Sequence, residues 1–161
     1  MKSITKALLL GVLCIGLLCG CTAKPETFSK GEISLTLTSG FDELKQEGAF
    51  AVYGSRDEAV MIQKEDFSTL ADIGISKDST LTDYANAVIH ANELRDTTVE
   101  ERDGVVCFIY EATTGKKTYA YLATVQKSDD AFWLIQFSAI KDKFDEKEAT
   151  FLTYAKSVTL S

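Results

Sequence analysis

Residues 105–113 read "VVCFIYEAT", a run that is apolar at nearly every position. In a strand, alternate side chains point to opposite faces, so this run places apolar side chains on both faces of a sheet. The two sets are Val105, Cys107 and Ile109 on one face and Val106, Phe108 and Tyr110 on the other. An antiparallel sheet usually leaves one face to water. This strand therefore predicts a sheet that is covered on both sides.

The residues around this strand extend it into an antiparallel meander. Asp103-Gly104 is a two-residue turn signal that links a strand over 97–102 to it. Polar turns at 114–116 and 128–130 separate two further strands, over 118–127 and 132–140. The last of these begins "FWLIQF" and again has apolar side chains on both faces.

Further strands are expected on either side of this meander. Residues 32–38 alternate between apolar and polar side chains, which is typical of a half-buried strand. Apolar runs at 49–53 and 59–63 flank Gly54-Ser55-Arg56-Asp57, a hairpin signal. Residues 158–160 are expected to add a final edge strand.

Two helices are predicted to cover the faces of the sheet. Residues 79–94 have helical spacing, and Thr80 with Asp83 resembles a capping box. A terminal helix is expected to start at an Asp145/Glu148 cap, with Phe144 packed on Ala149. The predicted fold class is α+β. It is an α/β/α sandwich with a mostly antiparallel sheet of about six or seven strands and helices on both faces.

The N-terminal region has the layout of an export signal. Lys2 and Lys6 precede an apolar stretch over 7–18, which is shorter than the roughly 20 residues of a membrane-spanning helix. Leu18-Cys19-Gly20-Cys21 then resembles a bacterial lipobox. The resemblance implies a diacylglyceryl group on the Cys21 sulfur and cleavage after Gly20. An ordinary secretory signal with incidental cysteines is the alternative.

These features predict three segments. Residues 1–20 are a cleaved lipoprotein signal peptide, 21–30 a lipidated tether, and 31–161 a single globular domain. The predicted location is the bacterial cell membrane, lipid-anchored on the extracytoplasmic side. Two acyl chains hold a protein stably on a membrane, whereas one chain gives only reversible binding.

The charge of the chain disfavours some classes of partner. The net charge is −7, and cleavage after Gly20 would remove Lys2 and Lys6 and no acidic residue, giving −9. A negative balance disfavours nucleic acid and broad adhesion to anionic lipid, because both reward positive surface.

A family resemblance supports the predicted fold. Phe28-Ser29, Gly31, Ile33-Ser34-Leu35, Leu37 and Gly40-Phe41 are similar to the start of PsbP-like and DcrB-like domains. The strand at 132–137 and the terminal helix from 144 to 158 extend the similarity, although Ser39 stands where the family often has proline. The resemblance implies an antiparallel sheet between helices and an accessory role, and it offers no catalytic residue.

Catalytic and metal chemistry have little support in the sequence. The only histidine is His90 on the predicted 79–94 helix, and the cysteine that would remain free is Cys107 in an apolar strand. Zinc needs more His or Cys ligands than these two, and neither cofactor nor metal is predicted. Cys107 is expected to be a buried hydrophobe and His90 a structural or solvent-facing residue.

The predicted function is a membrane-anchored, non-catalytic accessory module that binds an envelope protein. A small-ligand or lipid-binding module is the alternative, and a hydrolase is less favoured. Tyr119 and Tyr121 are the candidate partner surface, since tyrosine combines apolar area with a polar tip. The other possibility is that both rings complete the core.

Overall fold

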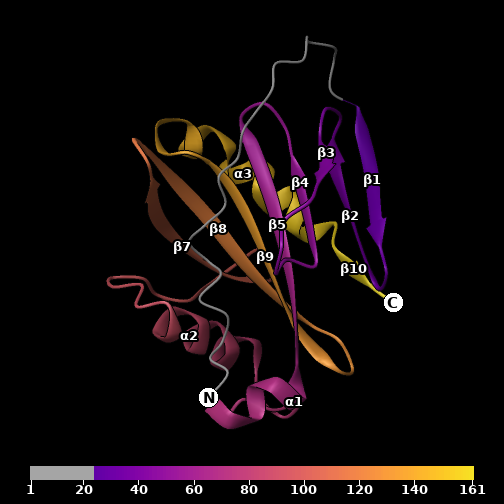
Figure 1. Ribbon diagram of the computed structural model, residues 1–161, viewed down its shortest axis with the longest axis vertical. Helices are drawn as coiled ribbons and strands as arrows, with labels where there is room; N and C mark the ends of the chain where they lie inside the picture. The colour runs from indigo at the N-terminus through magenta and orange to yellow at the C-terminus, as the bar shows by residue number, and fades with distance from the viewer. Residues whose placement is uncertain (1–23) are drawn as a thin grey trace.

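The computed structural model describes residues 24–161, which form two sheets and three α-helices (Figure 1). The large sheet is antiparallel with the order β3-β4-β5-β9-β8-β7-β6, and the small sheet has the order β1-β2-β10. The large sheet contains β3 (Asp42–Leu44), β4 (Ala51–Gly54), β5 (Glu58–Asp66), β6 (Glu100–Arg102), β7 (Val105–Thr114), β8 (Lys117–Lys127) and β9 (Ala131–Ile140). The small sheet contains β1 (Pro25–Lys30), β2 (Ile33–Thr38) and β10 (Thr159–Leu160). The helices are α1 (Phe67–Leu70), followed by the 3-10 turn Ala71–Ile73, then α2 (Leu81–Ala91) and α3 (Lys141–Lys156).

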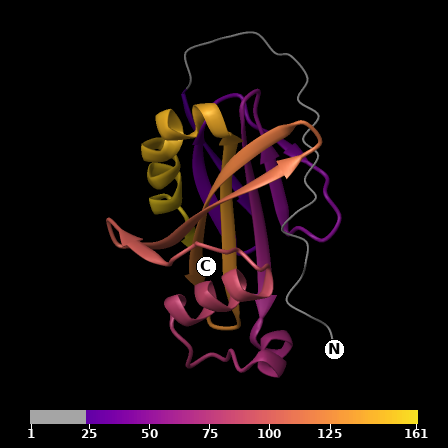
Figure 2. The same cartoon turned by 90° about the vertical axis from the view of Figure 1, so that its left-hand side faces the viewer.

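The predicted fold class is confirmed, and the large sheet is covered on both faces. Cys107, Trp133 and Phe137 lie in the core between the large sheet and α3. Apolar side chains of β2, in the small sheet, extend this core. Phe108 and Phe132 lie in a second core beneath α2. Figure 2 shows α3 beside the upper half of the molecule and α2 across its lower half. The alternation read from residues 105–110 therefore assigns each side chain to the correct core.

The start of α2 agrees with the sequence prediction. The Thr80 side chain accepts a hydrogen bond from the Asp83 backbone N–H at 3.1 Å, and the Asp83 carboxylate accepts one from the Thr80 backbone N–H at 2.8 Å. This pair is a capping box, because each side chain satisfies a backbone donor at the helix start.

The start of α3 differs from the prediction. The helix begins at Lys141 directly after β9, with Ile140 as its N-cap and no side-chain cap hydrogen bond. Asp145 and Glu148 lie inside the helix, and the cap assigned to them is wrong. Burial decides the start, because Phe144 packs with Phe151 in the core and so belongs to the apolar face of the helix.

Part of the segment predicted as a tether belongs to the folded domain. Residues 25–30 form β1, which pairs with β2 from Pro25↔Thr38 to Lys30↔Ile33. Proline is compatible with the first residue of an edge strand, where no ladder N–H is needed. Phe28 packs on Tyr53 with ring centroids 4.9 Å apart. The tether assigned to residues 25–30 is therefore wrong, and the prediction for residues 21–23 lies outside the described residues.

Two more boundaries differ from the sequence analysis. The strand predicted over 97–102 is limited to β6, and β3 lies between the strands predicted at 32–38 and 49–53, where no strand was expected. Both are three-residue edge strands of the large sheet. Short edge strands have weak sequence signals, because neighbouring strands rather than their own side chains fix them.

Candidate binding groove

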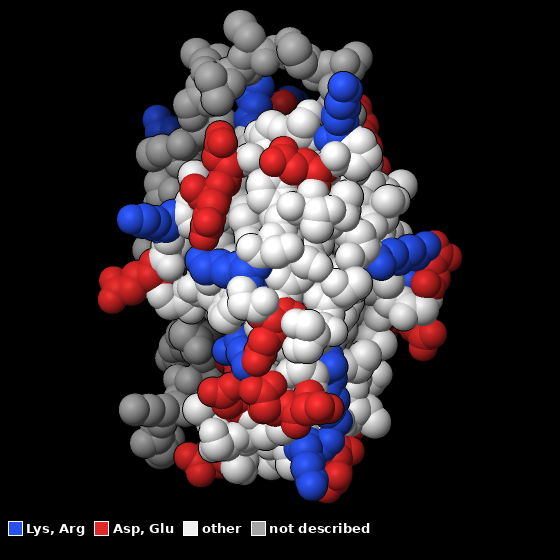
Figure 3. All heavy atoms as spheres, turned by 90° about the vertical axis from the view of Figure 1, so that its right-hand side faces the viewer, with Lys and Arg blue, Asp and Glu red and all other residues white. Residues whose placement is uncertain are grey.

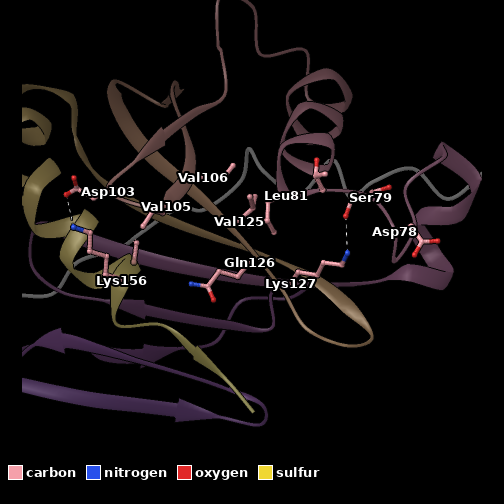
Figure 4. Close-up of a pocket in the computed structure, with 13 residues that line it drawn as sticks. Asp78, Ser79, Leu81, Asp103, Val105, Val106, Val125, Gln126, Lys127 and Lys156 are labelled. Atoms are coloured by element: carbon pink, nitrogen blue, oxygen red, sulfur yellow. Dashed lines mark hydrogen bonds and ion pairs between the residues drawn. The ribbon is translucent and has the colours of Figure 1, made fainter.

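An open groove lies where the β6–β7 turn, the end of β8 and the start of α2 meet (Figure 4). Its volume is about 730 Å³. Apolar side chains of β7, β8 and α2 form its walls, and charged side chains stand at its two ends. Its lining includes Leu81, Val105, Val106, Val125, Lys127 and Lys156.

The groove exists because β7 separates from β8. The pairing of these strands runs from Thr114↔Lys117 to Cys107↔Thr124 and ends there. Val105 pairs with Arg102 of β6 on its other side. Asp103 and Gly104 make the β6–β7 turn with φ values of 53° and 81°, the left-handed conformation that such two-residue turns require.

The separation leaves a short strand edge on β8. Residues 125–127 still pair with β9, from Val125↔Leu134 to Lys127↔Phe132, but no residue of β7 in the described chain is in register with them. On the β7 side, this three-residue edge faces the groove. Val125 is buried, whereas Val105 and Val106 are half-buried, so the wall next to the edge is apolar.

At one end of the groove, Lys127 joins the sheet to the segment before α2. Its ammonium group donates hydrogen bonds to the backbone carbonyls of Lys77 and Ser79, the second at 3.0 Å. The same nitrogen lies 5.2 Å from the centroid of the Phe132 ring. These contacts hold the start of α2 against the end of β8, as Figure 4 shows for Ser79.

At the other end, Lys156 joins α3 to the β6–β7 turn. Its ammonium group is 2.7 Å from the Asp103 carboxylate. The hydrogen bond from Lys156 lowers the pKa of Asp103. Both lysines at the ends of the groove are therefore engaged in contacts that fix its shape.

The groove does not assemble a proton-transfer or nucleophilic pair from the predicted residues. Cys107 is fully buried beside it, and burial raises the pKa of its thiol, which disfavours the thiolate that a nucleophile needs. His90 is exposed on α2 and does not line the groove. Among residues 24–161, no three His, Cys, Asp or Glu side chains are grouped to hold a metal ion.

Tyr119 and Tyr121 lie elsewhere, on β8 near its start. Both side chains are half-buried. Tyr121 stacks on Tyr110 with ring centroids 4.7 Å apart and planes 6° apart. Tyr110 in turn donates a hydrogen bond to Gln136, and Gln136 donates one to Gln63 at 3.2 Å. Tyr121 thus packs on the core beneath α2, and its role as a partner surface stays a prediction.

The predicted lipid site, Cys21 with cleavage after Gly20, lies outside the described residues. Within residues 24–161, none of the helices is both long and apolar enough to cross a bilayer.

The groove itself could not be found from the sequence. Val105, Val106 and Val125 have the same apolar pattern as the paired parts of their strands. The point where two strands part depends on sheet twist and on what packs beside them. The only local signal is Asp103-Gly104, which marks the turn but not the separation.

Similarity to known proteins is found among solved structures. A scan against protein-family models and a search of curated proteins found no match. Among solved structures, the chain resembles cyanobacterial PsbP (CyanoP) from Synechocystis sp. PCC 6803, with 20% identity and a TM-score of 0.57 over 89% of this chain and 98% of that one. A Bacteroides thetaiotaomicron protein matches at 11% identity and a TM-score of 0.52, over 80% of this chain and 45% of that one. LpqN of Mycobacterium tuberculosis, involved in cell envelope biogenesis, matches at 12% identity and a TM-score of 0.49, over 87% and 91%.

These features define an α+β fold that resembles the fold of cyanobacterial PsbP. The resemblance noted in the sequence is thereby confirmed at the level of the fold. One fold carries many functions, so the function of this chain depends on its own residues.

Proposed function

We propose that this protein is an extracytoplasmic lipoprotein whose domain is a non-catalytic module that binds an extended segment of an envelope protein. The anchor is a diacylglyceryl group on Cys21, exposed by cleavage after Gly20. Support for the anchor comes from the Leu18-Cys19-Gly20-Cys21 pattern behind a basic and apolar leader.

The observation that carries the binding role is the edge of β8 in the groove. Residues 125–127 have no register partner in β7, and apolar side chains of Val106 and Leu81 line the space beside them. An extended peptide adds to such an edge through its main chain, while its alternate side chains enter neighbouring pockets. The groove offers both features side by side.

The volume of the groove keeps a small ligand as the second candidate. About 730 Å³ lies within the roughly 300–1,000 Å³ typical of small-molecule sites. Such sites enclose most of the ligand, however, and this groove is open along one side. An open groove with a strand edge favours a polypeptide.

The anchor is tested with Cys21→Ala and the matched variant Cys19→Ala. In cells that express the full chain, we expect Cys21→Ala to lose acyl labelling and to leave the membrane fraction. Cys19→Ala should keep both properties, because its position accepts small residues. Unchanged labelling and fractionation in Cys21→Ala would show that the anchor is wrongly assigned.

The groove is tested by placing a photocrosslinking amino acid at Gln126, which lines it, and at Asn86, an exposed position on α2 that does not line it. We expect one discrete protein adduct in cells from position 126 and none from position 86. A Val106→Glu substitution in the groove should abolish the adduct. Equal adducts from both positions, or a purified domain that retains a small molecule and gives no adduct, would contradict a polypeptide partner.

A further inference from the structure

The register of the strands brings five segments to the end of the domain where the described chain begins. Lys24 is fixed there, since its backbone N–H donates to the Ser39 hydroxyl at 3.0 Å and its carbonyl accepts from the Ser39 N–H at 2.6 Å. Gly54 pairs with Asp42 and Ala59, and Glu58 pairs with Ala139. Figure 1 shows these connections together at the upper end. We call this the tether end, defined by residue 24 and the segments 39–42, 54–58, 114–117 and 140–143.

The tether end is rich in basic side chains. It carries six of them, Lys24, Arg56, Lys116, Lys117, Lys141 and Lys143, and all six are exposed. Its acidic residues are Asp42, Asp57, Glu58 and Asp142. Glu58 is buried and bound to Lys147 at 2.5 Å, so its charge is already neutralised.

Four of the basic side chains are available to a partner. Lys141 and Lys143 form ion pairs with Glu111 and Asp57 at 2.8 Å and 3.2 Å. Within residues 24–161, no ion pair involves the other four: Lys24, Arg56, Lys116 and Lys117.

The opposite end of the domain has the reverse charge. The connections at 31–32, 66–80 and 128–130 carry six acidic residues and one basic residue, Lys77, and two further basic residues, Lys30 and Lys127, border them. The acidic residues are Glu32, Asp66, Asp72, Asp78, Asp129 and Asp130. In Figure 3 basic side chains occupy the upper tip with acidic side chains just below them, and a group of acidic side chains lies toward the lower end with basic side chains beside it. The connections at the two ends therefore differ in the sign of their summed charge, although the net charge of the chain is negative.

The position of β1 fixes how far the tether end can lie from a membrane. Cys21 and Lys24 are three residues apart, and a chain extends by at most about 3.6 Å per residue. A lipid on Cys21 would hold Lys24 within roughly 11 Å of the attachment point. This distance is close to the Debye length of about 8 Å at physiological ionic strength. The basic side chains would therefore interact electrostatically with the headgroups.

We propose that the tether end docks on anionic lipid headgroups and holds the anchored domain upright, with its acidic end directed away from the membrane. The proposal rests on the proposed lipid anchor. Free adhesion of an acidic protein is disfavoured, but the anchor supplies attachment and the local charge then selects the orientation. Each Lys or Arg near an anionic surface changes the equilibrium by about fivefold.

The test uses the full chain, as processed by the cells that express it, in vesicles that contain a headgroup-linked quencher. A fluorophore is placed by Ser55→Cys at the tether end or by Ser68→Cys on α1 at the opposite end. Labelling is selective because Cys107 is fully buried. In phosphatidylglycerol vesicles at 0.1 M salt, we expect strong quenching at position 55 and little at position 68. In phosphatidylcholine vesicles, or at 1 M salt, the difference should largely disappear.

A charge variant adds a matched comparison. Replacing Arg56, Lys116 and Lys117 with Gln should lower the docked-to-undocked ratio by on the order of 100-fold. The control replaces Lys45, Lys77 and Arg95 with Gln, an equal charge change at exposed positions outside the tether end, and should preserve the quenching.

The two possible failures are distinguishable. A chain that does not attach to either kind of vesicle would overturn the lipid anchor. Docking on anionic headgroups would be overturned by a chain that attaches but shows equal quenching at positions 55 and 68. It would also be overturned by quenching that is the same in phosphatidylglycerol and phosphatidylcholine vesicles.

Discussion

Cys107 illustrates how a chemically suggestive residue takes a structural role. Its side chain projects from β7 and is fully buried in the core beneath α3, and burial raises the pKa of its thiol. The apolar residues around it in the sequence were enough to predict this placement. When the burial of a residue follows from its position in a strand, that burial can be predicted from the sequence.

We predict that Cys107→Ser lowers the free energy of unfolding by about 1–3 kcal/mol, because it buries a hydroxyl among apolar groups. Cys107→Ala, which removes the sulfur without adding a polar group, should cost less. Urea denaturation of the three proteins measures the difference. A serine variant as stable as the native chain would mean that the site is hydrated.

Asp130 gives a prediction about pH. Its carboxylate accepts a hydrogen bond from Lys64 at 2.8 Å, and Lys64 also binds Glu32 at 2.6 Å, which joins the β8–β9 turn to the β1–β2 turn. The hydrogen bond from Lys64 lowers the pKa of Asp130 below its ordinary 3.8. A lowered pKa in the folded state stabilises the fold above the unfolded pKa, and this stabilisation is lost as the pH falls.

We therefore expect Asp130→Asn to be less stable than the native chain at pH 7, and the difference to shrink as the pH falls below about 4. Urea midpoints measured between pH 7 and pH 3 check this trend. Asp129→Asn is the control, because Asp129 forms no ion pair within the described residues. A difference that grows toward acid pH would contradict the assignment.

At the scale of elements, the two long helices show what local sequence signals can and cannot decide. The Thr80/Asp83 box was found from the sequence because a capping box is local, within four residues. The similar Asp145/Glu148 pattern is misleading, since α3 starts at Lys141, where β9 ends and the core beneath Phe144 begins. Tertiary burial therefore overrides a local cap signal.

Thr80→Ala should destabilise the domain by about 1 kcal/mol, the usual cost of losing a helix N-cap. Thr80→Ser keeps the hydroxyl and should restore most of the stability. Thermal unfolding followed by circular dichroism measures both variants. No change in Thr80→Ala would indicate that Asp83 and Lys127 hold the start of α2 without the cap.

The assignment of β1 to the folded domain is also testable. A chain that starts at Gly31 loses the whole of β1 and the contact of Phe28 with Tyr53, so it should unfold at a lower urea concentration than a chain that starts at Lys24. Phe28→Ala in the longer chain should account for part of the loss. Equal stability of the two chains would return residues 25–30 to the tether.

At the scale of the whole molecule, the sequence predicted the layers but not the surfaces. Apolar side chains on both faces of β7 and β9 require cover, and the structure provides it with α2, α3 and the small sheet. The groove and the charge difference between the two ends depend on where β7 leaves β8 and on which turns share an end of the sheet. These are non-local properties, and they are the ones on which the proposed binding and docking depend.

The most direct test of the proposed anchored module is mass spectrometry of the N-terminal peptide of the protein from its native membrane. The lipoprotein assignment predicts a mature chain that begins at Cys21 with a diacylglyceryl group on its sulfur. A chain that retains residues before Cys21, or one that begins at an unmodified residue, would contradict it.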